Sequence, residues 1–191
     1  MKTVNIKIIK STICILTPFI LTICSCKKDD TDPKNPGDPN ESELITTIQL
    51  TFKDTSGMIP DRVFVFSDPD GDGGNAPTRS DTIRIDSQKT YDVSILLLDE
   101  SKVPADTISN EVLAEAEDHM FFFLQSGVNI NTSYLDIDAN GLGLGLESRW
   151  VCGAPSIGVS RIVLKHQPDE KDGTFAPGET DVDVSFRAEL Q

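Results

Sequence analysis

The sequence contains few cysteines for its 191 residues, and three of the four lie near the start of the chain. Cys14, Cys24 and Cys26 fall within the first 26 residues, whereas Cys152 stands alone far downstream. If the N-terminal segment is removed or modified during export, Cys152 is the only remaining thiol and no disulfide can form within the chain. A lone cysteine in a strand-like setting is typical of a small buried apolar side chain.

Positive charge is also scarce. The chain has 17 Lys and Arg against 31 Asp and Glu, which gives a formal net charge of −14 at pH 7. A surface of this sign repels phosphate backbones, so nucleic acid is excluded as a partner. The acidic balance suits the capture of cations, or it serves solubility alone.

Motifs of catalytic machinery are missing as well. The sequence has no GxSxG, no HExxH and no CxxC, and its GLGLG stretch lacks the spacing and the following helix of a dinucleotide-binding turn. The remaining thiol has no evident activating partner. We therefore predict that the protein is not an enzyme.

What the sequence does contain begins with an export signal. Residues 1–25 combine basic residues with an apolar run from Ser11 to Ile23, as in a lipoprotein signal peptide. The following ICSC resembles a lipobox, and because Ser25 is small, Cys26 is the expected lipidated residue that anchors the chain to a membrane. Residues 26–42 then form a flexible acidic tether. The Lys-Lys-Asp-Asp at 27–30 resembles the surface-export signal of Bacteroidota lipoproteins, which implies an outer-membrane protein that faces the cell exterior.

Residues 43–191 predict a single, mostly β domain, an antiparallel immunoglobulin-like β-sandwich with one short helix. In ETDVDVSFRAEL, apolar residues from Val182 onward alternate with Asp181, Asp183 and other polar residues, which predicts a strand with one buried and one solvent-facing side. The helix is expected from Asn110 to about Asp118, with Ser109 as its cap and Ile108 packed on Leu113. Further strands are predicted at 44–52, 61–67, 81–85, 90–98, 120–125, 129–135, 148–152 and 160–166.

Two acidic loops approach calcium-binding patterns. DIDANGLGLGLE at 136–147 fits D-x-[DN]-x-[DN]-G-x5-E, with Asp136, Asp138 and Asn140 as candidate ligands. If the Leu and Gly residues between were extended, Glu147 would lie roughly 15–20 Å from the aspartates, so an acidic hairpin loop is the favoured interpretation. SDPDGDGGNAP spaces Asp68, Asp70 and Asp72 at alternate positions, where a Gly/Asp turn without an ion is the alternative.

The two histidines form the other candidate site. His119 follows the acidic segment EVLAEAED, and His166 follows the strand-like VLK. Imidazole together with carboxylate suits zinc, so the candidate ligands are His119 and His166 with Glu117, Asp118 or Asp136. Each histidine can instead be structural or exposed. A joint site requires the two side chains to lie within about 5 Å of each other.

Three segments, EVLAEAEDHMFFF, YLDIDANGLGLGL and KHQPDEKDGTFAPGETDVDVSF, resemble a family of small Bacteroidota lipoproteins labelled "type 1 periplasmic binding fold superfamily". The likeness spans most of 43–191, and His119 and His166 both fall in the shared segments, which implies a joint role. The label implies a two-lobed α/β receptor, whereas the length and strand pattern predict a sandwich.

Such proteins accompany outer-membrane TonB-dependent receptors for metals. The resemblance therefore implies an accessory role in the capture of a divalent metal, zinc first and calcium second. The alternative is an immunoglobulin-like surface interaction domain with calcium-stabilised or metal-free acidic loops.

Overall fold

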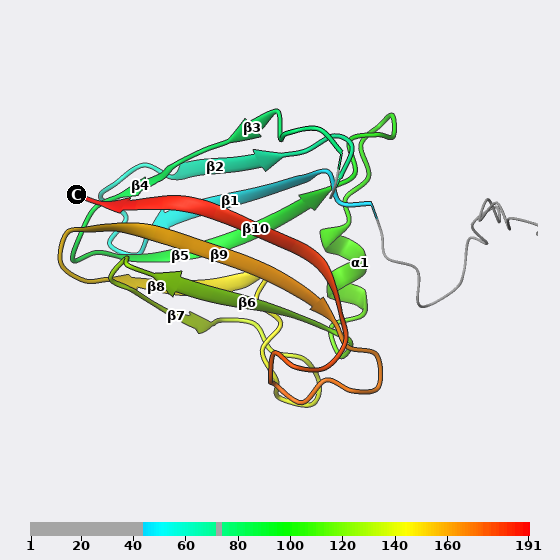
Figure 1. Ribbon diagram of the computed structural model, residues 1–191. Coiled ribbons are helices and arrows are strands. Elements are labelled where there is room, and N and C mark those ends of the chain that lie inside the picture. Colours follow the sequence, from blue (N-terminus) through cyan, green and yellow to red (C-terminus); the bar gives the residue numbers. More distant parts are fainter. Residues whose placement is uncertain (1–43, 72–73) are drawn as a thin grey trace, which may run out of the picture. The chain divides into compact units, whose positions relative to one another are not determined.

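The computed structural model describes residues 44–71 and 74–191, which form two β-sheets packed face to face (Figure 1). The predicted signal peptide, Cys26, the tether and Asp72 lie outside the described residues. No helix in the described ranges is long and apolar enough to cross a membrane. The prediction of a mostly β sandwich with one short helix is confirmed.

The first sheet has six strands in the order β3-β2-β1-β5-β8-β7, and all its neighbours are antiparallel. Their bounds are β1 Thr47–Asp54, β2 Arg62–Ser67, β3 Arg79–Ser80, β5 Thr90–Leu98, β7 Ile130–Tyr134 and β8 Glu147–Cys152. The alternating segments predicted from the sequence supply five of these strands, and β3 is a two-residue addition.

The second sheet has four strands in the order β4-β10-β9-β6, with bounds β4 Ile83–Ile85, β10 Glu179–Leu190, β9 Ser156–His166 and β6 His119–Ser126. β10 pairs antiparallel with β9, and β9 with β6, but β4 runs parallel to β10. Two residues separate β3 from β4, so the chain crosses between sheets without a hairpin reversal. The expectation of purely antiparallel pairing is therefore corrected at this edge.

The core lies between the sheets and follows from the period-two pattern. Val182, Val184, Phe186, Ala188 and Leu190 of β10 are all buried, as their alternation predicts. Opposite them, Phe52 packs edge-on against Trp150, with ring centroids 5.1 Å apart, and both side chains are fully buried. Burying a large apolar side chain contributes roughly 1.5–3 kcal/mol, so these alternating rows hold the two sheets together.

The helix α1, Ser109–Ala114, is shorter than predicted and begins differently. Ser109 does not cap it, because its hydroxyl accepts a hydrogen bond from the Leu97 amide of β5 at 2.6 Å. Leu113 points to solvent, and Val112 packs into the core beside Ile108. Contact with the sheet has replaced the local cap, and α1 gives way to a turn before His119 opens β6.

Candidate metal centre

The second sheet brings the two histidines together. His119 is the first residue of β6, His166 is the last of β9, and the two are directly opposite in the register. Opposed residues share one face of a sheet with Cβ atoms about 5 Å apart, so the pairing itself places the rings side by side. The rings are stacked at 4.6 Å between centroids and 5° between planes, and both residues are buried. The requirement for a joint site is met.

Glu115 completes a group of three. One carboxylate oxygen of Glu115 and one nitrogen of each histidine all lie within 4.8 Å of one another. Glu115 sits in the exposed turn between α1 and β6, where its amide donates to Glu111 and its carbonyl accepts from Asp118. The group thus combines two buried imidazoles with one exposed carboxylate at the end of the sandwich.

Hydrogen bonding fixes the proton on His119. Its Nδ1 lies 3.1 Å from the carbonyl oxygen of Glu115, which can only accept, so Nδ1 carries the proton and Nε2 presents a free lone pair. Burial lowers the pKa of His119 below its usual 6.5, although the Glu115 carbonyl and nearby Asp181 act in the other direction. The ring is therefore neutral near pH 7. A backbone carbonyl that orients a neutral imidazole is a common support for a metal ligand.

Asp181 lies beside His119 but outside the group of three. Its Oδ2 lies 3.8 Å from His119 Nε2, and its side chain is only 8% exposed. Burial raises the pKa of Asp181, while His119 and His166 partly offset that effect. The alternation of ETDVDVSFRAEL placed Asp181 on the solvent face, and the structure corrects this. The register of β10 against β9 shifts between Thr180 and Val182, so Asp181 is the extra residue of an irregularity that no periodic pattern reveals.

The carboxylates predicted for this site are not the ones that reach it. Glu117 is exposed, Asp118 accepts from the Asp169 amide at 3.4 Å, and Asp136 lies in another loop; none belongs to the group of three. Glu115 takes their place because the turn at 115–118 brings it back beside His119: the Glu115 carbonyl accepts from the Asp118 amide and lies 3.1 Å from Nδ1 of His119. The Glu-x-x-x-His spacing was the signal in the sequence that could have found it.

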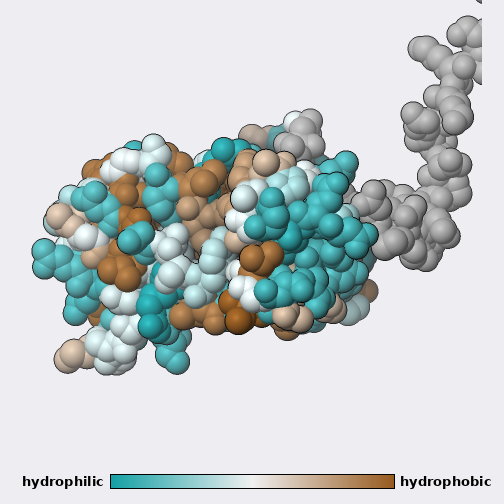
Figure 2. All heavy atoms as spheres, turned by 90° about the horizontal axis from the view of Figure 1, so that it is seen from below, coloured by the Kyte–Doolittle hydropathy of each residue, from teal (hydrophilic) through white to brown (hydrophobic). Residues whose placement is uncertain are grey.

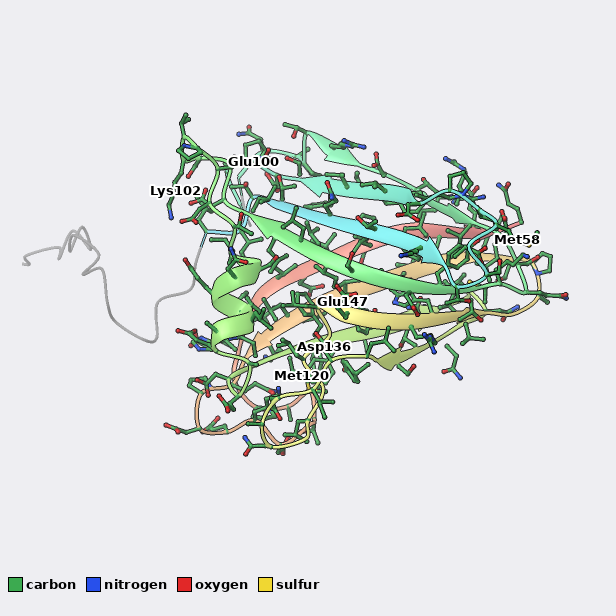
Figure 3. All side chains as sticks on the ribbon, turned by 180° about the vertical axis from the view of Figure 1, so that it is seen from behind. Met58, Glu100, Lys102, Met120, Asp136 and Glu147 are labelled. Carbon is green, nitrogen blue, oxygen red and sulfur yellow. The ribbon has the colours of Figure 1, made fainter. Side chains whose placement is uncertain are left out.

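The acidic loop at 136–147 is a folded hairpin connection. Asp136 accepts hydrogen bonds from the amides of Gly145 at 2.7 Å and Glu147 at 3.0 Å. Ile137 bridges Gly143, so the chain doubles back instead of extending. The expected separation of Glu147 from the aspartates is therefore wrong, and Figure 3 shows Asp136 and Glu147 side by side. The hairpin interpretation holds, with the loop closed by its own carboxylate.

Asp138 is committed to the same loop and to a buried lysine. Its Oδ1 accepts from the amides of Asn140 and Leu142, and its Oδ2 lies 2.8 Å from Lys171 Nζ, with both side chains at most 2% exposed. Burial alone would raise the pKa of Asp138, but Lys171 and the amides outweigh it and the pKa is lowered. The positive charge that this loop needs comes from the protein itself.

The other acidic loop is described only in part, because Asp72 lies outside the described residues. In the remainder, Asp70 Oδ2 accepts hydrogen bonds from both the amide and the side chain of Asn75 at 2.8 Å. These bonds lower the pKa of Asp70. This is the local bonding of an Asp-rich turn.

Hydrophilic residues, shown in teal, gather over the right-hand end of the domain in Figure 2, the end that carries α1 in Figure 1. Two imidazole nitrogens with carboxylate oxygen suit zinc and similar transition metals, whereas calcium and magnesium favour oxygen alone.

Comparison of the chain with protein-family models, curated proteins and solved structures finds no match.

Proposed function

We propose that this protein is a lipid-anchored binding protein of the outer membrane that holds a divalent metal ion such as zinc and serves TonB-dependent uptake. The observation that carries the proposal is the stacked pair of His119 and His166, with one nitrogen of each ring and one carboxylate oxygen of Glu115 within 4.8 Å of one another.

Burial and charge support capture from solution. The two imidazoles are buried in the sheet, while Glu115 is exposed on a turn, so an ion can first meet the carboxylate and then the nitrogens. The formal charge of −14 concentrates cations around the molecule. Membrane attachment, outward orientation and a TonB-dependent partner rest on the N-terminal sequence and on the family resemblance.

The test is thermal unfolding of the full chain in detergent, stripped of metal, with zinc chloride added. Zinc at 100 times its dissociation constant adds about 2.7 kcal/mol to the free energy of unfolding, which raises Tm by about 5–10 °C for a domain of this size. His119→Ala and His166→Ala should abolish the rise, and Glu115→Gln should reduce it. Glu117→Gln is the matched control, because this exposed neighbour lies outside the group of three.

An unchanged Tm with zinc, or a rise that survives both histidine substitutions, contradicts the proposal. Calcium chloride is the comparison ion. We expect no calcium response from the loop at 136–147, because Asp136 and Asp138 already accept from amides and Lys171. Asp138→Asn should therefore leave the response to both ions unchanged.

One observation favours the second candidate, a surface interaction domain. The residues of β1, β2 and β5 that point away from the core are uncharged in the middle of the sheet: Gln49 and Thr51 are flanked by Val63, Ser94 and Leu96, and by Val65, which is only 8% exposed. Val63 is 47% exposed. An uncharged face on so acidic a protein suits contact with another protein, and it becomes the leading account if zinc has no effect.

A further inference from the structure

Asp181 differs from the other buried acids in what faces its carboxylate. Asp138 accepts from two amides and pairs with Lys171, and Asp99 accepts from the amide and hydroxyl of Ser101. Within the described ranges no hydrogen-bond donor reaches the carboxylate of Asp181, and its ion-pair neighbour is His119. A buried carboxylate without donors is costly unless a cation accompanies it.

The neighbouring atom does not supply a proton in its neutral form. Because Nδ1 of His119 donates to the Glu115 carbonyl, the Nε2 that lies 3.8 Å from Asp181 carries a lone pair. Two acceptors thus face each other inside the protein. A positive ion between them resolves the conflict and binds both.

The distance suits such an ion. With zinc bonds of about 2.0–2.2 Å, two ligand atoms at tetrahedral positions lie about 3.4 Å apart. The 3.8 Å between His119 Nε2 and Asp181 Oδ2 is a few tenths of an ångström longer than that estimate. Asp181 lies outside the group of three whose ligand atoms are all within 4.8 Å of one another, so its carboxylate must move by side-chain rotation to share one ion with them.

The local backbone explains why this aspartate is available. An extra residue in one strand re-aims a side chain that would otherwise follow the alternation, and such bulges are frequent beside functional sites. Here the register shift falls at Asp181, while the apolar residues from Val182 to Leu190 still face the core at every second position.

We propose that Asp181 becomes a fourth protein ligand when the ion binds, and that it then joins Glu115, His119 and His166, the group outside which it lies in this structure. The inference rests on the proposed metal function. His119, His166 and Asp181 come from three neighbouring strands and hold the ion inside the sheet. Glu115 lies on the exposed turn, and its carboxylate is the ligand that dissociates from the ion when the ion enters or leaves.

Cobalt(II) is the probe, because four-coordinate cobalt has visible bands several times as intense as those of six-coordinate cobalt. Full-length wild type should show the intense bands. Asp181→Asn should weaken them and reduce the affinity at least about 10-fold in competition with a chelator. Asp183→Asn is the matched control, because Asp183 lies on the same strand but is exposed and paired with Arg161.

A second variant gives a positive signature. In Asp181→Cys, a thiolate bonded to cobalt produces a near-ultraviolet charge-transfer band that Asp183→Cys should lack. The band appears only if residue 181 is bonded to the ion, so it separates a ligand from a charged neighbour. Circular dichroism of each metal-free variant verifies that it is folded.

The outcomes separate the two proposals. If wild type binds no cobalt, the proposed function and this inference both fail. If wild type binds cobalt through the histidines, but Asp181→Asn keeps its affinity and spectrum and Asp181→Cys shows no charge-transfer band, the metal function stands and the role of Asp181 is overturned.

Discussion

At the scale of single residues, glycines decide how the loop at 136–147 can fold. Gly141 has φ +81° with open space around its Cα. Gly145 has φ +96°, and a Cβ there would lie 2.7 Å from the Cβ of Phe121 and 3.1 Å from the ring of Tyr134. The first glycine supplies only backbone conformation, whereas the second also allows the loop to pack against β6.

The two glycines should therefore respond differently to the same substitution. Gly141→Ala should cost about 1 kcal/mol, from strain at positive φ alone. Gly145→Ala should cost about 2–4 kcal/mol, because overpacking against Phe121 and Tyr134 adds to that strain. Urea unfolding of the metal-free variants measures both. Equal costs at the two positions would contradict the close packing of the loop.

At the scale of elements, Lys171 joins three segments that are far apart in the sequence. It belongs to the β9–β10 connection, pairs with Asp138 of the β7–β8 connection at 2.8 Å, and donates to the carbonyl of Ala116 in the turn after α1 at 2.8 Å. Figure 1 shows the yellow and orange connections next to each other at this end of the domain. The turn that Lys171 holds is the one that carries Glu115.

Removing the charge of Lys171 should strongly destabilise the fold. Lys171→Met leaves the carboxylate of Asp138 buried and unpaired, which we expect to lower the free energy of unfolding by about 3 kcal/mol. Adding Asp138→Asn should recover part of the loss, because the uncompensated charge is gone. Arg161→Met is the control: its pair with Asp183 is exposed and should be worth less than about 1 kcal/mol. Chemical denaturation of wild type, the two single variants and the double variant measures each free energy of unfolding. If Lys171→Met and Arg161→Met lost equal amounts of stability, the buried pair would not be worth more than the exposed one.

At the scale of the whole molecule, net charge opposes compactness. With 31 acidic and 17 basic residues, repulsion outweighs attraction when summed over the surface. The range of these forces falls from about 30 Å at 0.01 M salt to about 8 Å at 0.15 M. Screening should therefore stabilise the fold.

We expect sodium chloride, raised from 0.01 to 0.15 M in the presence of a chelator, to increase the free energy of unfolding by an amount on the order of 1 kcal/mol. Thermal unfolding at constant pH measures the change. The chelator removes divalent ions as a cause, and sucrose at equal osmolality controls for general solute effects. A fall in Tm with salt would mean that the exposed ion pairs outweigh the net repulsion.

The sequence predicted what depends on local periodicity. Alternation identified β10 and most other strands, because a half-buried strand must repeat every two residues. The pairing of His119 with His166 depends on strand order, which no local pattern contains. Asp181 was missed because the register shift interrupts the alternation, and Glu115 because the turn after α1 that brings it beside His119 was not predicted. The pairing register between distant strands determines which side chains meet at the site, whereas the local sequence pattern determines only where the strands lie.

The parallel pairing of β4 with β10 has a consequence for the order of folding. Ala188 pairs with Ile83, so this contact closes a loop of about one hundred residues, and its closure costs about 2 kcal/mol more than closure of the short β9–β10 connection. β9 and β10 should therefore associate first, and β4 should dock late. Until it docks, β10 has an open edge that other chains can pair with. His166 and Asp181 are then in register before the opposite edge of their sheet is sealed.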